Sequence, residues 1–496
     1  MNAEKYANCK FAFSLLLVIL ILAVTGCGSG ATEIPATPSG TFAQPTAPPT
    51  KPPTDTPIPT LSPTAAPTST AASHSIPAEP ADVIFHNGRI ITMDEGMPLA
   101  EAIAFRSSLI QVVGTDEEIL ALQGPQTKMI DLQGRTILPG FVDPHTHILN
   151  DAEAHLGLNL GEAQDLALRN GITTLADMYV DEGILKGLRS LESAGNLRVR
   201  TSVYLVATNN CGEPLGDWYT AYPPTDEFGG MLRIGGVKLF LDGGTCGPAA
   251  VSEVLKTSEG KGTLFLSDEK LAEIVRRADG AGYQIAIHAL GDRAVDQAID
   301  ALDAVIDSPG NPERHRVEHA LFMVDGQFSR FSEMGVNPVI FGNWQTCSED
   351  GTGYTENWKR NIRRWRELVD ANPGLVIAAK TDYPWLGPPS PLLELYSLTT
   401  LREAAGDGSI CEPAEWLADR TLTITEALPM LTINAAYLLF MEDEVGSLES
   451  DKLADLIVLS GNPLDNPDGI KDLSVLVTVV GGKTAYCAAG QQALCP

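Results

Sequence analysis

A pair of histidines, His145 and His147, follows the apolar segment 139–142. Residues two apart in a strand face the same side, so both imidazoles can bind one metal ion through a ring nitrogen. A His-x-His pair alone is weak evidence for a metal, because such pairs occur by chance. Its position at the end of an apolar strand gives it more weight, and it predicts the beginning of a metal site.

Three further residues with metal-binding chemistry come at the ends of apolar segments. His288 and His319 each end a short segment, and Asp382 follows residues 378–381. Each has an ordinary interpretation on its own, as a buried histidine or as an Asp that starts a turn before Pro384. The chain has only 8 His, yet four of them fall at predicted strand ends. That coincidence predicts one shared site, in which Asp382 can also take a proton from metal-bound water.

Lys238 lies within the otherwise apolar segment 236–241. A buried ammonium is costly unless it is paired or neutralised. One solution is a reaction of the neutral amine with CO₂, which gives an anionic carbamate able to bridge two metal ions. The other is an ion pair with a neighbouring carboxylate such as Asp242. From the residues alone, the ion pair is the simpler interpretation.

These side chains need a scaffold that gathers strand ends. Eight apolar segments, most of them separated by helical patterns such as 268–281 and 292–306, are expected to be strands: 137–143, 171–177, 200–206, 236–242, 284–288, 316–319, 338–341 and 375–381. Strands buried on both faces have such continuous apolar runs, and barrel enzymes place their sites at the carboxyl ends of the strands. The sequence therefore predicts an α/β fold built on a (β/α)₈ TIM barrel, with a doubly wound sheet as the alternative.

The regions on either side of the barrel show the alternation of β-strands. Residues 82–92 alternate around a turn at Asn87-Gly88, and 102–114 form a second hairpin. Strands at 454–459 and 475–480 follow the barrel, so we expect the two ends to meet in a composite β-sandwich. The predicted domains are a signal peptide at 1–27, a stalk at 28–80, the metal-dependent barrel at 139–440, and a β-sandwich formed by residues 81–138 together with residues 441–496.

The N-terminal segment has the features of an export signal. The apolar run 11–24 is short for a membrane span and ends in Val24-Thr25-Gly26-Cys27, which resembles a bacterial lipobox, whose Cys is acylated. The alternative is an uncleaved anchor helix. Residues 28–80 are rich in Pro and Thr and cannot bury apolar surface. We therefore expect a protein held to the cell membrane by a lipid on Cys27, on the extracytoplasmic face.

Composition bounds the partners. The 496 residues include 34 Lys and Arg against 63 Asp and Glu, a formal net charge of −29. Nucleic acid is not an expected partner, because phosphate binding needs clustered Lys and Arg. Whether the chain forms a homo-oligomer is left open. An even number of cysteines in the body permits disulfides in an exported protein, with buried thiols as the alternative: Cys211, Cys246, Cys347, Cys411, Cys487 and Cys495. The last two could close a short loop.

The motifs together resemble the amidohydrolase superfamily, and within it amidohydrolase family 3, which includes N-substituted formamide deformylases. The matching segments are, in chain order, PGFVDPHTH, GITTL, GGVKLFLDGG, IHALGDRAVD, RHRVEHA, TDYP, TINAA and VGSLESDKLADLIVL. They cover residues 81–465 and are specific in combination. The chain departs from the family at 241–244, where Leu-Asp-Gly-Gly replaces the more usual Ala-Asp-Gly-Ser, and in the short segment between His147 and Gly171. These departures bear on the substrate rather than on the metal site.

The resemblance implies two divalent metals, zinc being the expected ion. His145 and His147 would bind the more buried one, His288 and His319 the second, and a carboxylated Lys238 would bridge them. Asp382 would be both a ligand and the general base. Three residues at strand ends that face the barrel mouth are candidates for substrate contact: Asp177, Trp344 and Gln345.

The expected activity is hydrolysis of a C–N bond in a small molecule, an amide, an N-formyl group or a cyclic amide, by metal-activated hydroxide. Two alternatives remain: lactone or phosphoester hydrolysis on the same barrel, and a catalytically retired solute-binding lipoprotein. All six expected metal-site residues are present, which argues against the second alternative.

Overall fold

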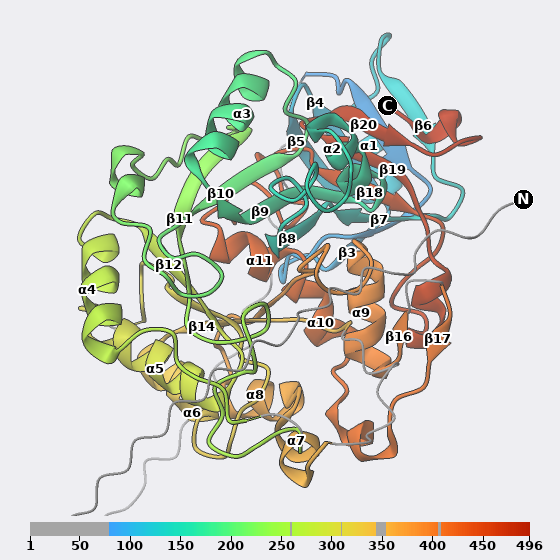
Figure 1. The fold of residues 1–496 in the computed structure, drawn as a ribbon. Coiled ribbons are helices and arrows are strands. Elements are labelled where there is room, and N and C mark those ends of the chain that lie inside the picture. Colours follow the sequence, from blue (N-terminus) through green and yellow to red (C-terminus); the bar gives the residue numbers. More distant parts are fainter. Residues whose placement is uncertain (1–78, 258–259, 309, 344–353, 405–407) are drawn as a thin grey trace, which may run out of the picture. The chain divides into compact units, whose positions relative to one another are not determined.

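Eight parallel strands form a nearly closed barrel in the computed structural model, which describes residues 79–257, 260–308, 310–343, 354–404 and 408–496 (Figure 1). Each strand pairs with the next one along the chain. The strands are β8 (Phe141–Thr146), β9 (Ile172–Val180), β10 (Arg200–Val206), β11 (Leu232–Phe240), β12 (Gln284–Ala289), β13 (Arg316–His319), β14 (Asn337–Ile340) and β15 (Ala378–Ala379). The predicted barrel is thereby confirmed, and the doubly wound sheet is wrong.

The ring closes between β15 and β8 through backbone bonds just beyond the last strand. The Asp382 amide donates to the His145 carbonyl at 3.1 Å, and the His147 amide donates to the Tyr383 carbonyl at 2.8 Å. Closure therefore brings the segment that carries Asp382 against the segment that carries both histidines.

Helices connect most consecutive barrel strands and pack their apolar faces against the outside of the barrel. The predicted helices at 268–281 and 292–306 are α4 and α5, and only a 3₁₀ turn, Trp218–Ala221, lies between β10 and β11. The helices are α2 (Leu160–Arg169), α3 (Glu182–Ser193), α4 (Asp268–Asp279), α5 (Asp292–Asp303), α6 (Phe328–Met334), α7 (Glu356–Asn361), α8 (Trp365–Ala371), α9 (Pro391–Thr400), α10 (Ile424–Met430) and α11 (Ile433–Leu438). Among the described residues, no helix has the length and apolarity required to cross a bilayer.

Two flanking sheets share a second apolar core. One has the order β5-β4-β1-β6 and the other β20-β19-β18-β7-β2-β3, so the second joins segments from both ends of the chain, as predicted. Their strands are β1 (Val83–His86), β2 (Arg89–Ile91), β3 (Leu99–Ala100), β4 (Ala102–Arg106), β5 (Leu109–Gly114), β6 (Lys128–Asp131), β7 (Thr136–Pro139), β18 (Leu456–Leu459), β19 (Val475–Val480) and β20 (Lys483–Cys487). Helix α1 (Asp116–Leu120) follows β5, and β16 (Glu403–Ala404) pairs with β17 (Ile410–Cys411) in a separate ribbon.

The expected hairpin at 82–92 is wrong, although the second hairpin, β4–β5, is confirmed. Strand β1 pairs with β4 and β6, whereas β2 pairs with β3 and β7. Phe85 and Ile90 both point into the core between the two sheets, so the turn at Asn87 carries the chain from one sheet to the other. Alternation identified the strands here, but it carries no information on which strands they pair with.

The first predicted barrel strand, 137–143, is in fact two strands in two sheets. Strand β7 pairs with β18 and β2 in the flanking sheet, and β8 begins the barrel at Phe141. Gly140 lies at the crossing, where a Cβ atom would approach the Thr173 Oγ1 to 2.1 Å. Only glycine lets the backbone pass there, so one apolar run serves two sheets.

Two disulfides join pairs of described cysteines, and Cys411 is also disulfide-bonded. Cys487–Cys495 closes the short C-terminal loop that the sequence pointed to. Cys211–Cys246 links the segment after β10 to the segment after β11, both at the site end of the barrel. Cys347 lies outside the described residues.

Candidate metal centre

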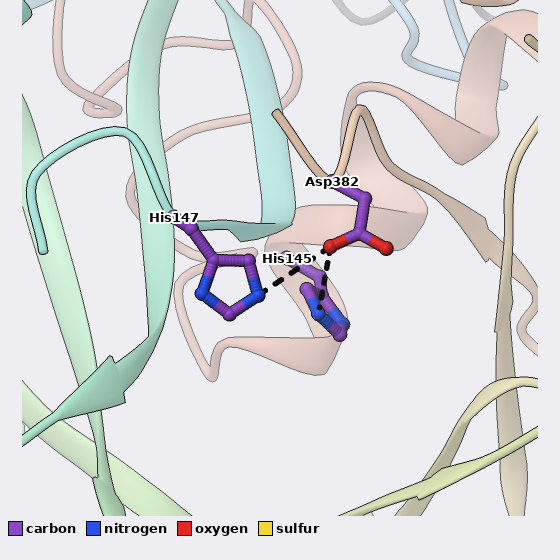
Figure 2. A group of neighbouring side chains, drawn as sticks. All are labelled: His145, His147 and Asp382. Atoms are coloured by element: carbon purple, nitrogen blue, oxygen red, sulfur yellow. Dashed lines mark ion pairs between the residues drawn. The ribbon is translucent and has the colours of Figure 1, made fainter. Parts of the chain in front are cut away.

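Three of the predicted ligands meet at the carboxyl end of the barrel. The Nε2 atoms of His145 and His147 each lie 3.4 Å from Asp382 Oδ1. Figure 2 shows both imidazoles pointing toward this carboxylate, and all three side chains are buried. Among the described residues, these three form the one group whose donor atoms lie close enough together, within 4.8 Å of one another, to hold a metal ion.

The other nitrogen of each ring is fixed by a neighbour. His145 Nδ1 lies 2.5 Å from Glu318 Oε2, and His147 Nδ1 lies 3.1 Å from Asn150 Oδ1. Both partners are acceptors, so each histidine donates from Nδ1 and keeps the Nε2 lone pair free. Metal-binding histidines are held in this way, with a carboxylate or amide oxygen behind the ring.

The protonation states also suit a cation. Burial, together with the positive charges of Lys238 and Lys380, lowers the pKa of His145 to about 3, so its imidazole is neutral. Burial alone would raise the pKa of Asp382, but the Lys380 charge and the neighbouring histidines outweigh it, and that pKa lies well below its ordinary value. Ligand atoms bonded to one tetrahedral zinc at about 2.1 Å lie about 3.4 Å apart. The three residues therefore fit one divalent metal.

Lys238 projects into the same site from β11. Its side chain is fully buried, and Nζ lies 3.5 Å from His145 Nε2. Burial lowers the pKa of Lys238 to about 7. The carboxylate that could have paired with it, Asp242, instead accepts backbone N–H bonds at 2.8–2.9 Å from the residues at positions 250, 290 and 291. Asp242 thus fixes the loops around the site rather than neutralising the lysine.

The two remaining predicted ligands lie on the opposite side of Asp382. His319 Nδ1 is 3.5 Å from Asp382 Oδ2, and the His288 and His319 ring centres are 4.4 Å apart. His288 donates from Nε2 to the Gly243 carbonyl at 2.9 Å. His319 has a φ of 75°, which breaks the alternation of β13 and turns its ring toward the site. The predicted ligands are therefore neighbours, but only His145, His147 and Asp382 are grouped as a metal site would require.

Two central residues were not predicted. Lys380 is fully buried, and its Nζ lies between the predicted ligands, 2.9 Å from His319 Nδ1 and 3.3 Å from Asp382 Oδ2. Glu318 joins His145 to the buried Arg316, whose Nε lies 2.5 Å from Glu318 Oε1. The signal that singled out Lys238, a lone charge in an apolar strand, is also present at Lys380 and Glu318.

A cavity of about 540 Å³ opens over the metal-binding residues, a volume typical of small-molecule sites. Its wall combines the site histidines and Asp382 with aromatic, apolar and polar side chains: Asn150, Asp151, His155, Tyr179, Asn210, Phe240, Thr245, Leu290, Trp385 and Leu386. No Lys or Arg is among the described residues that line it.

The predicted substrate contacts are placed elsewhere or lie outside the described residues. Asp177 is fully buried and accepts the backbone N–H groups of Leu149 and Asn150, each at 3.0 Å. It supports the loop that follows His147 and does not line the cavity. Trp344, Gln345 and the lipidation candidate Cys27 lie outside the region that the structure describes.

Comparisons with known proteins identify the family of the chain. A model described as the amidohydrolase family matches residues 160–486. The chain is 27% identical to Protein LONG AFTER FAR-RED 3 of Arabidopsis thaliana, over 80% of this chain and 68% of that protein. It is 31% identical to the N-substituted formamide deformylase of Arthrobacter pascens, over 52% of this chain and 46% of that enzyme. It is 25% identical to the imidazolonepropionase of Symbiobacterium thermophilum, over 77% of this chain and 91% of that enzyme.

Solved structures share the fold at low sequence identity. An uncharacterized metal-dependent hydrolase from Pyrococcus horikoshii superposes with a TM-score of 0.64 at 19% identity, covering 78% of this chain and 99% of that one. The A. niger ochratoxinase superposes with a TM-score of 0.54 at 18% identity, covering 83% of this chain and 97% of that one.

Proposed function

Since the chain belongs to the amidohydrolase family, we propose that it is a zinc-dependent hydrolase of a C–N bond in an amide, an N-formyl group or a cyclic amide. The observation that carries the proposal is the convergence of two histidine Nε2 atoms on Asp382 Oδ1, at 3.4 Å each. The fixed tautomers and the cavity above them support it.

Each residue has a defined task in this reaction. A divalent metal, when bound, polarises a carbonyl group and makes water more acidic. Asp382, ionised across the neutral range, accepts the proton of the attacking water and passes it to the leaving nitrogen. His147 and His145 would hold the metal, and Glu318 accepts from His145 Nδ1 and so keeps the Nε2 lone pair of that ring free. The cavity wall positions the carbonyl group over these atoms.

We also propose that Lys238 carries a carbamate, which would give the metal an oxygen ligand. The side chain is buried beside His145 Nε2, and a pKa near 7 makes the neutral amine available to CO₂. Replacing Lys238 with Ala should therefore lower the bound zinc, and formate or acetate should restore some of it. Zinc content after dialysis, measured by mass spectrometry, checks this. Full zinc content in Lys238→Ala would contradict the carbamate.

The cavity and the relatives support a proposed substrate class. The wall presents Tyr179, Phe240 and Trp385 and no described Lys or Arg, so it suits a neutral or cationic molecule with an apolar or aromatic substituent. The names of the deformylase and imidazolonepropionase relatives indicate N-formyl and cyclic amide substrates for those proteins. We therefore place an N-substituted formamide or a small cyclic amide first.

A substrate panel tests this choice. Zinc-loaded protein and protein stripped by a chelator should be offered N-substituted formamides, cyclic amides, lactones and phosphotriesters. We expect zinc-dependent release of amine from the first two classes. Turnover of only the lactones or phosphotriesters would favour lactone or phosphoester hydrolysis, the alternative activity of this barrel. A protein that holds stoichiometric zinc and turns over none of the four classes would contradict the proposal.

We propose that the enzyme works outside the cytoplasmic membrane, held by a lipid on Cys27. The lipobox-like segment 24–27 and the Pro/Thr-rich segment after it support this location. A Cys27→Ser variant should lose incorporation of labelled fatty acid and move from the membrane fraction to the soluble fraction. Equal labelling of the variant and the wild type would contradict acylation at this residue.

A further inference from the structure

The side chain of Lys380 lies against His319 and Asp382, two residues expected to bind a second metal. Its Nζ lies 2.9 Å from His319 Nδ1, 3.3 Å from Asp382 Oδ2 and 3.0 Å from His145 Nδ1. The residue is fully buried in the segment directly after β15. Its amine therefore lies beside the His319 imidazole and Asp382 Oδ2, two donors that would otherwise suit a divalent cation, whereas His145 Nδ1 is already bonded to Glu318.

The two oxygens of Asp382 consequently face different partners. Oδ1 is directed at the Nε2 atoms of His145 and His147, and Oδ2 is directed at Lys380 and His319. A carboxylate that bridges two metals would have one ion on each side. Here the second side is taken by an amine of this chain.

The histidines of the second group are engaged as well. His319 Nδ1 lies within hydrogen-bond distance of Lys380 Nζ, and His288 Nε2 donates to the Gly243 carbonyl. Neither residue belongs to a group of three acidic or histidine donors near enough to hold a metal, within the region of the chain that the structure describes. The residues thus fit one metal and do not fit a second.

We propose that Lys380 occupies the place of the second metal, so that the enzyme binds a single divalent ion at His145, His147 and Asp382, beside the Lys238 carbamate proposed above. This rests on the proposed function, because it presumes that the first metal binds. It replaces the two-metal centre that the sequence resemblance implied. Lys380 acts as a positioning residue: it donates to one lone pair of Asp382 Oδ2, which leaves the other lone pair of Oδ2 for the proton of the attacking water and Oδ1 for the metal.

Metal stoichiometry tests this directly. The full protein, stripped and then reloaded with excess Mn²⁺, should retain about one equivalent after gel filtration. Lys380→Ala, which empties the space, should retain about two. Lys380→Met, which fills the space with a neutral group that binds Mn²⁺ poorly, should stay near one. Lys186→Ala, at an exposed lysine of α3, controls for the loss of a lysine elsewhere.

A double variant identifies where the added ion binds. The single variant His319→Ala should still bind about one equivalent of Mn²⁺, like the wild type. The double variant Lys380→Ala/His319→Ala should also bind about one, whereas Lys380→Ala alone binds about two. Electron paramagnetic resonance gives an independent readout, because an isolated Mn²⁺ shows a six-line spectrum whereas a close pair is spin-coupled. We expect the isolated spectrum in the wild type and the coupled one in Lys380→Ala.

The outcomes separate this inference from the proposed function. Two equivalents with a coupled spectrum in the wild type would overturn the inference and leave the hydrolase proposal standing. One equivalent in a folded Lys380→Ala, checked by circular dichroism, would also overturn it. If that variant does not fold, the wild-type stoichiometry and spectrum decide alone. A wild type that binds no metal would overturn both.

Discussion

Replacing Asp382 with Asn should lower kcat by about 10²–10⁴-fold, the usual contribution of a positioned general base. The amide keeps the size of the side chain and one oxygen for the metal, but it cannot accept a proton from water. Zinc should therefore remain bound while turnover is lost. Steady-state kinetics on an N-substituted formamide, together with zinc content measured on the same sample, checks both expectations.

Asp151 offers a matched control for that substitution. It is a carboxylate of the same cavity, but it bonds to the Trp385 indole at 2.9 Å and to the His155 ring. Asp151→Asn should leave kcat within a few-fold of the wild type. If Asp382→Asn turned over at a similar rate, the proton transfer would have to be assigned to another group.

Replacing Glu318 with Gln should weaken both the metal site and the fold. The NH₂ group of the glutamine must face either the N–H of His145 or the N–H of Arg316. In either case two hydrogen-bond donors face each other and no bond forms between them. If the NH₂ group faces His145, the imidazole can accept from it only by moving its proton from Nδ1 to Nε2. That tautomer has no Nε2 lone pair for the metal. We expect zinc affinity to fall by about 10–100-fold and the free energy of unfolding to fall by about 3–5 kcal/mol, since the buried Arg316 loses the carboxylate that it bonds directly.

A second buried ion pair separates these two effects. Arg200 and Asp455 are both buried and bond at 2.7 Å, between β10 and the segment before β18. Asp455→Asn should lower the stability to denaturant by a similar amount while zinc affinity, measured by competition with a chelator, stays unchanged. Equal loss of zinc in both variants would mean that Glu318 acts only through stability.

The ligands could be predicted from sequence because each carries a local signal. His145, His288 and His319 end apolar runs, and the eightfold recurrence of such runs indicated the barrel. Parallel strands then bring their carboxyl ends to one edge, so a metal site followed from topology without any contact being known. The structure confirms that edge, with all four predicted imidazoles and Asp382 beside one another.

What could not be predicted depends on pairing between distant segments. The turn at Asn87 has the sequence of a hairpin, but Phe85 and Ile90 belong to two facing sheets, and only tertiary packing decides that. Asp177 was expected to end a barrel strand like a ligand, yet it lies within β9 and accepts backbone N–H groups of the loop after His147. Lys380 carries the same lone-charge signal as Lys238, but only the structure shows that its Nζ contacts His319 and Asp382.

X-ray diffraction from crystals of the zinc-loaded protein, collected above and below the zinc absorption edge, tests the central claim most directly. We predict one anomalous peak, bonded to His145 Nε2, His147 Nε2 and Asp382 Oδ1 at about 2.0–2.2 Å. No second peak should lie between His319 and Asp382 Oδ2, where Lys380 Nζ lies. A structure with no peak among His145, His147 and Asp382, despite zinc in the crystal, would contradict the metal site.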